Sequence, residues 1–87
     1  MGTDEFVKVG KKAVLEMALK SFDPTDNVKI TEDDVYFVTC AYILGNIKGM
    51  FSTNIKDSKY YEVTYNAATK EMYVDQYVKI NQNIVTF

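Results

Sequence analysis

The alternation of apolar runs and short turns between residues 35 and 75 restricts the possible folds of this chain more than any other feature. Val35 to Leu44 is an unbroken run of apolar, β-branched and aromatic residues, which is typical of a strand covered on both faces for much of its length. The turn Gly45-Asn46 follows it. Three further strands and two further turns are predicted: strands Gly49–Ile55, Tyr60–Asn66 and one that opens at Glu71–Asp75, and turns Lys56–Lys59 and Ala67–Lys70. Because such short turns join antiparallel neighbours, the sequence predicts an antiparallel meander.

Residues 3–22 precede the strands and have the spacing of an amphipathic helix. Thr3 or Asp4 can cap its N-terminus, and the segment Asp23–Asn27, which contains Pro24, ends it. One broad apolar face consists of Phe6, Val7, Val9, Gly10, Ala13, Val14, Met17 and Ala18. A narrower second stripe is formed by Leu15, Leu19 and Phe22. This stripe is expected either to contact the C-terminal segment or to form a ridge that binds a partner.

These elements predict a single α+β domain over residues 1–87. Its N-terminal helix packs on one face of a four-stranded antiparallel meander sheet. A chain of 87 residues buries only about 60–65% of the surface that its unfolded form exposes, so one small core is expected. After Asp75 the helical spacing of Tyr77, Ile80 and Ile84 competes with continued strand alternation. We expect a short C-terminal helix or an irregular tail there.

Strand alternation divides the predicted sheet into two faces. The face expected to meet the helix carries Tyr61, Val63, Tyr65, Met72 and Val74, and the opposite face carries Tyr60, Glu62, Thr64, Tyr73 and Asp75. In the first strand, the residues assigned to the core are Val35, Phe37, Ala41 and Ile43. That assignment turns the others outward: Tyr36, Val38, Cys40, Tyr42 and Leu44. An outward face this apolar needs a cover, either from the chain's own tail or from another molecule.

Several residue types are missing, and their absence excludes some kinds of site. The chain has no His, no Trp and no Arg, so its ten basic residues are all Lys. The commonest general base and zinc ligand is therefore lacking, and so is the side chain that clamps phosphate with two hydrogen bonds. A net charge of −2 and scattered lysines disfavour binding to nucleic acid. We expect no cofactor and no nucleic-acid partner.

The sequence also favours a cytoplasmic location. Cys40 is the single cysteine, which rules out an internal disulfide and fits a reducing compartment. The first residues lack the order of a signal peptide, and no apolar run reaches transmembrane length. We therefore expect no membrane partner.

The acidic triplet Glu32-Asp33-Asp34 is the first candidate site. It lacks the alternating acids, the Gly and the closing Glu of a calcium loop, and consecutive carboxylates converge poorly on one ion. Thr31 and Asp34 have the spacing of a capping arrangement, so a single turn before the strand is the favoured interpretation. Cys40 has no His to activate it and lies within an apolar strand, which favours a structural cysteine over a nucleophile. No metal site is expected.

Glu62 and Asp75 form the second candidate site. If they face each other across neighbouring strands, the pKa of one would rise and acid–base chemistry would become conceivable. Acids on the exposed side of a sheet are more often solvated neighbours of Lys, and this is the favoured interpretation.

Three segments of the chain resemble a known family: Lys29–Tyr36 (KITEDDVY), Phe51–Asn54 (FSTN), and Tyr60–Asn66 (YYEVTYN) followed by Glu71–Asp75 (EMYVD). Their order and spacing are similar to those of small uncharacterised proteins of bacteriophages and prophages in Gram-positive bacteria of low G+C content. The resemblance extends from about residue 12 to residue 83. It implies a biological setting but no chemistry, because that family has no established activity. In that family a Trp often stands at the positions of Thr39 and Ile80, and this chain has neither.

These observations lead to the hypothesis of a non-enzymatic phage or prophage accessory protein that binds a host or phage protein, as an inhibitor of a host enzyme or a defence system does. The expected contact residues are Tyr36, Tyr42, Tyr60 and Tyr73, with Glu62 and Asp75 giving polar specificity. One alternative is a homodimer that uses the same face. Another is an enzyme or small-ligand binder that uses Glu62, Asp75 and tyrosine hydroxyls.

Overall fold

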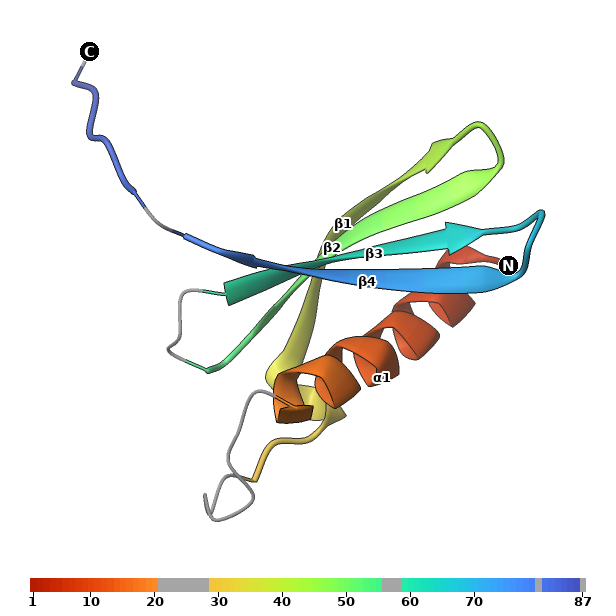
Figure 1. Ribbon diagram of the computed structural model, residues 1–87, viewed down its shortest axis with the longest axis horizontal. Helices are drawn as coiled ribbons and strands as arrows, with labels where there is room; N and C mark the ends of the chain where they lie inside the picture. The colour runs from red at the N-terminus through yellow and green to blue at the C-terminus, as the bar shows by residue number, and fades with distance from the viewer. Residues whose placement is uncertain (21–28, 56–58, 80, 87) are drawn as a thin grey trace.

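The computed structural model describes residues 1–20, 29–55, 59–79 and 81–86. In these residues one helix, α1 (Thr3–Lys20), and a single 3₁₀ turn (Glu32–Asp34) precede the strands β1 (Val35–Ile43), β2 (Asn46–Thr53), β3 (Lys59–Asn66) and β4 (Glu71–Val78). The strands form one antiparallel sheet in the order β1-β2-β3-β4, and α1 crosses one face of it (Figure 1). The predicted α+β fold, with an N-terminal helix on a four-stranded meander, is confirmed.

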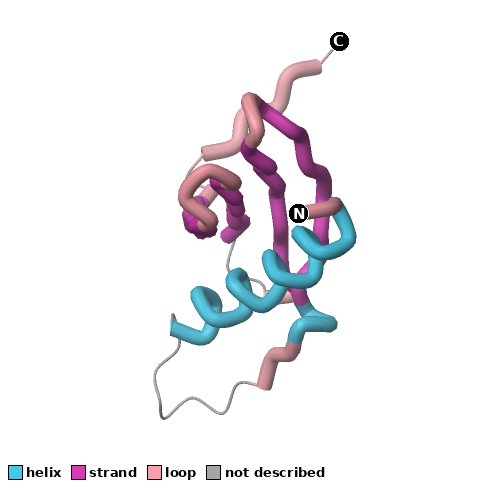
Figure 2. The backbone as a smooth tube through the Cα atoms, turned by 90° about the vertical axis from the view of Figure 1, so that its right-hand side faces the viewer, coloured by secondary structure: helices cyan, strands magenta, loops and turns pink. Residues whose placement is uncertain are grey.

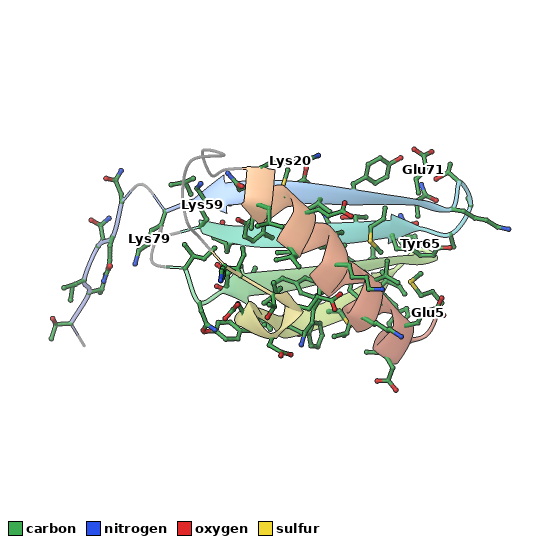
Figure 3. All side chains as sticks on the ribbon, turned by 90° about the horizontal axis from the view of Figure 1, so that it is seen from below. Glu5, Lys20, Lys59, Tyr65, Glu71 and Lys79 are labelled. Carbon is green, nitrogen blue, oxygen red and sulfur yellow. The ribbon has the colours of Figure 1, made fainter. Side chains whose placement is uncertain are left out.

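The hydrophobic core lies between α1 and the side of the sheet that faces it; Figure 3 shows α1 lying across the strands, with the side chains drawn. The buried residues of this core are Phe6, Val14, Ala18, Val35, Ile47, Phe51, Tyr61 and Val63. Tyr65, Met72 and Val74 are partly buried against them. The sequence therefore predicted the helix-facing residues of β3 and β4 correctly, because both strands alternate without interruption.

Two glycines bring the helix and the sheet close together. A Cβ atom on Gly10 of α1 would lie 2.6 Å from Cζ of Phe51, and a Cβ atom on Gly49 of β2 would lie 2.5 Å from Cε1 of Phe6. Each aromatic ring thus occupies the space above the glycine of the opposite element. The ring centroids of Phe6 and Phe51 are 6.0 Å apart with an interplanar angle of 53°, a tilted contact that aromatic pairs favour.

A β-bulge interrupts β1 and was not predicted. Phe37 lies opposite Phe51, and Thr39 lies opposite the next residue of β2, Met50. Val38 is therefore an extra residue without a partner in the register. A bulge of this kind shifts the alternation of side chains by one position.

Because of the bulge, the predicted orientation of the side chains in the second half of β1 is wrong. Val35 and Phe37 face the helix as predicted, but beyond the bulge Cys40 pairs with Gly49 and Tyr42 with Ile47. These partners lie on the helix side, so Cys40 and Tyr42 also point that way, and Ala41 and Ile43 point away. The hydroxyl groups of Tyr42 and Thr3 lie 2.7 Å apart, which links β1 to the start of α1.

The turn between β1 and β2 lies one residue earlier than predicted. Ile43 pairs with Asn46, so the connection consists of Leu44 and Gly45, with φ values of 49° and 84°. Positive φ at both positions is the signature of a type I′ turn. β2 consequently begins at Asn46 and not at Gly49. The predicted turn at Ala67–Lys70 is confirmed; the helix stop at Asp23–Asn27 lies outside the described residues, as does most of the turn at Lys56–Lys59.

The C-terminal part of the chain also differs from the expectation. β4 continues to Val78, with Tyr77 paired to Tyr60 and Val78 to Lys59. Residues 81–86 have no regular secondary structure, are all exposed and extend away from α1 (Figures 1 and 2), so the short helix is not found in the described residues. The contact expected between the second helix stripe and the C-terminal segment is not formed by residues 81–86. Leu15 instead packs on the core, Leu19 is exposed, and Phe22 lies outside the described residues.

Candidate functional site

The side of the sheet that faces away from α1, hereafter the outer face, is the candidate site. Figure 2 shows α1 on one side of the strands and the C-terminal end directed away from it. Within the described part of the chain, no helix or strand packs on the outer face. The expectation that β1 is covered on both sides is therefore wrong for these residues: Val38 and Ile43 are both more than half exposed.

A row of aromatic side chains crosses one end of the outer face. Tyr36 of β1, Ser52 of β2, Tyr60 of β3 and Tyr77 of β4 lie opposite one another in the register. The rings of Tyr60 and Tyr77 are stacked, with centroids 5.1 Å apart and an interplanar angle of 12°. The three tyrosines are between 37% and 45% exposed, so each offers an apolar surface and a hydroxyl group to a partner.

Charged side chains occupy the middle of the outer face. Nζ of Lys48 lies 2.9 Å from Oε1 of Glu62, and Glu62 lies opposite Asp75, as the sequence suggested. The hydrogen bond to Glu62 and its negative charge raise the pKa of Lys48 above the usual lysine value, with smaller contributions from Tyr77 and Asp75. Glu62 is thus a neighbour of a lysine. The sequence favoured this arrangement for Glu62 and Asp75 over a pair that performs acid–base chemistry.

A hollow of about 180 Å³ lies over β1 and β2 beside the bulge. Its lining consists of Thr39, Cys40, Ala41, Lys48, Gly49, Met50 and Glu62. A second hollow of about 120 Å³ adjoins it at Lys48. A cavity of roughly 150 Å³ accepts a group the size of benzene, whereas small-molecule sites usually measure about 300–1,000 Å³. The larger hollow therefore fits a single side chain, and Asp75 does not line it.

The structure brings together most of the predicted contact residues. Tyr60, Tyr73, Glu62 and Asp75 lie on the outer face together with Tyr36. Tyr42 does not: the bulge turns it toward the helix side, and its predicted outward position is wrong. Tyr77 was missed, although the alternation that placed Tyr73 and Asp75 outward reaches it two residues later.

The acidic triplet is the boundary of a strand. Glu32–Asp34 forms the single 3₁₀ turn, and Asp34 accepts hydrogen bonds from the backbone N–H of Thr31 at 2.8 Å and from Nδ2 of Asn54 at 3.2 Å. These two bonds, the Thr31 bond first, lower the pKa of Asp34 below its usual value. The capping arrangement predicted for Thr31 and Asp34 is confirmed.

Cys40, the other candidate from the sequence, is a free thiol that is half-buried against the core. In the described ranges, no three or more His, Cys, Asp or Glu side chains are grouped so that they could hold a metal ion. Among the same residues, no helix is both long and apolar enough to cross a membrane.

Residues 7–87 match the model of DUF6275, a family of unknown function. The chain belongs to this family. The match includes all four strands and most of α1, so the family is defined by the same domain that forms the outer face. No curated protein and no solved structure matches the chain. Membership in DUF6275 confirms that the resemblance noted in the sequence is to an uncharacterised family, and it assigns no chemistry to the outer face.

Proposed function

We propose that this member of DUF6275 is a non-enzymatic protein that binds another protein through its outer face. The observation that carries the proposal is the combination, on one uncovered side of the sheet, of half-exposed tyrosines with a hollow the size of one side chain. Tyrosine is enriched at protein interfaces because its ring is apolar and its hydroxyl group can be hydrogen-bonded.

The total exposed surface supports this proposal. The chain exposes 6442 Å², whereas a compact monomer of 10.0 kDa is expected to expose about 5,200 Å². The excess, about 1,200 Å² over the whole chain, is larger than the roughly 800 Å² that a standard protein interface buries on each partner.

The charges of the outer face indicate which partner it fits. Glu62, Asp75 and Glu71 lie there with Lys48 as their counterpart, and Lys48 already pairs with Glu62. A partner surface with exposed Lys or Arg would complement this excess of carboxylates, and Arg would also stack on the tyrosine rings. Phosphate groups of nucleic acid would be repelled.

The biological setting belongs to the same proposal. The motif resemblance supports a phage or prophage accessory protein, including an inhibitor of a host or defence protein. The single cysteine supports a cytoplasmic location. Two alternatives have less support. A small-ligand site that uses Glu62 and Asp75 would need both at one pocket, and the hollow is lined by Glu62 without Asp75. A dimer joined face to face would bring the carboxylates of both copies together.

Affinity capture from a low-G+C Gram-positive host tests the proposal with two matched substitutions. Tyr60→Ala removes a tyrosine from the outer face, and Tyr42→Ala removes the same side chain from the helix side, where it is more exposed (60% against 37%). Loss of an interface tyrosine that packs against the partner should weaken binding by about tenfold or more. We expect Tyr60→Ala to lose the captured protein and Tyr42→Ala to retain it.

Circular dichroism establishes that both variants are folded. Equal retention by the two variants, or loss by Tyr42→Ala alone, would contradict the assignment of the outer face. Binding should also weaken as salt is added, because charge complementarity across an interface is screened.

A further inference from the structure

The two edges of the sheet differ in how they are protected. β1 forms one edge and contains the bulge at Val38, a device that discourages pairing with another chain. β4 forms the other edge, pairs with β3 in an uninterrupted register, and contains neither Lys nor Pro. No backbone hydrogen bond between the described residues reaches β4 from outside the sheet. As far as the described residues go, the backbone edge of β4 from Glu71 to Asp75 is therefore regular and open to a further strand.

We infer that β4 pairs antiparallel with β4 of a second copy of this chain, so that two four-stranded sheets become one of eight strands. This goes beyond the proposed function and does not depend on it. The occupant of the edge is identified by the side chains of β4, because their order is complementary to itself in a register that pairs almost the whole strand.

That register has its twofold axis at Val74. Residues on one side of a strand pair with residues on the same side of its neighbour, so Tyr73 lies opposite Asp75 of the second copy and Glu71 lies opposite Tyr77. Each carboxylate then lies opposite a tyrosine and not opposite another carboxylate. Toward the helix side, Val74 lies opposite itself.

The neighbouring registers are less favourable. An axis at Asp75 brings the two Asp75 carboxylates together, and an axis at Tyr73 sets Glu71 opposite Asp75 twice. Like charges directly opposite one another destabilise a strand pair. The axis at Val74 leaves no two carboxylates directly opposite each other and still pairs residues 71–77 along almost the whole of β4.

The arrangement places both outer faces on the same side of the joined sheet. The twofold axis is perpendicular to the sheet, so it does not exchange its sides. The tyrosine rows of the two copies become parts of one continuous surface. A partner with two equivalent sites would then be bound at both.

Sedimentation velocity across the micromolar range tests the pairing with three variants. Wild type should sediment at about twice its monomer mass of 10.0 kDa. Tyr73→Asp places a carboxylate opposite Asp75 of the second copy and should give a monomer, whereas Tyr73→Lys places a cation there and should remain dimeric. Thr64→Asp is the matched control, because Thr64 lies beside Tyr73 on the outer face but on β3, and it should remain dimeric. A monomeric wild type, or a dimer that Thr64→Asp disrupts and Tyr73→Asp does not, would overturn the inference.

Cross-linking tests the register. In a Cys40→Ser background, Val74→Cys places two thiols at the twofold axis, at a separation that suits a disulfide. Mild oxidation should cross-link this variant at least tenfold faster than Asp75→Cys in the same background. Equal rates, or faster cross-linking of Asp75→Cys, would refute the pairing at Val74. Circular dichroism confirms that each variant retains its fold.

Discussion

Gly10 and Gly49 are positions at which α1 and the sheet approach each other closely. Each lies beneath a phenylalanine ring of the opposite element, and a Cβ atom at either position would overlap that ring. Gly in the middle of a helix normally costs about 0.5–1 kcal/mol relative to Ala. At Gly10 the contact with Phe51 reverses this preference.

Gly10→Ala should therefore destabilise the protein although it improves helix propensity. Overpacking costs typically about 1–3 kcal/mol, so a net loss of about 1 kcal/mol in the free energy of unfolding is expected in urea denaturation. Gly2→Ala is the control, because a Cβ atom there meets nothing within 4 Å. Combining Gly10→Ala with Phe51→Leu should cost less than the sum of the two changes. A stabilised Gly10→Ala variant would show that the ring moves aside freely.

The sequence indicated where Gly10 lies but not why it is glycine. The helical period placed it on the apolar face together with Phe6 and Val14. The requirement for a missing side chain arises from Phe51, which is separated from Gly10 by about half the chain and meets it only when the helix docks. The same applies to Tyr42, whose orientation is determined by an extra residue four positions earlier.

The 3₁₀ turn before β1 is held by the carboxylate of Asp34. Its two hydrogen bonds, to the N–H of Thr31 and the amide of Asn54, favour the charged form and lower its pKa in the folded state. A carboxylate with a lowered pKa contributes stability at pH values above its pKa in the unfolded chain. That contribution is lost as the pH falls through the folded-state pKa.

Asp34→Asn should consequently destabilise the protein at neutral pH, and its difference from wild type should shrink as the pH falls below about 4, the usual aspartate range. Urea denaturation at neutral and acidic pH measures the effect. Asp33→Asn is the control, since it removes the same charge from the same turn without removing these two bonds. If the two variants show the same pH dependence, the bonds of Asp34 are not its source.

The order and type of the elements could be read from the sequence, whereas two of their details could not. Helical spacing in α1 and alternation in β3 are both long and regular, so the fold class followed from them. The bulge in β1 has no local marker, because Val38 is an ordinary strand residue without a glycine beside it. β4 is longer than expected because the spacing of Tyr77, Ile80 and Ile84 also fitted a helix, and pairing with β3 decides between them.

The domain has two layers, helix and sheet, and its Cα atoms extend over 45 × 37 × 19 Å. The two-layer arrangement explains why the residues of the outer face could be predicted from the sequence. A single helix can cover only one side of the sheet, so alternation alone sorted Tyr60, Glu62 and Asp75 to the uncovered side. The hollow beside the bulge was not predictable, because it results from the irregular register.

Removal of residues 80–87 should leave the stability of the domain nearly unchanged. Residues 81–86 are exposed, and the hydrogen bond from Nζ of Lys79 to Gln82 joins two exposed side chains. We expect the free energy of unfolding to change by less than about 0.5 kcal/mol, as for most surface changes. Urea denaturation of the shortened chain measures this. A loss of about 2 kcal/mol or more would mean that the C-terminal residues cover the sheet.

The extra residue at Val38 also lets β1 lose one residue without exchanging its two sides. Deleting Val38 would join Phe37 directly to Thr39, whose partners Phe51 and Met50 are already consecutive in β2, so Tyr42 would still point toward α1 and Ile43 would still point outward. Members of DUF6275 that lack this residue could thus keep the same outer face while presenting a straight, unprotected β1 edge to solvent.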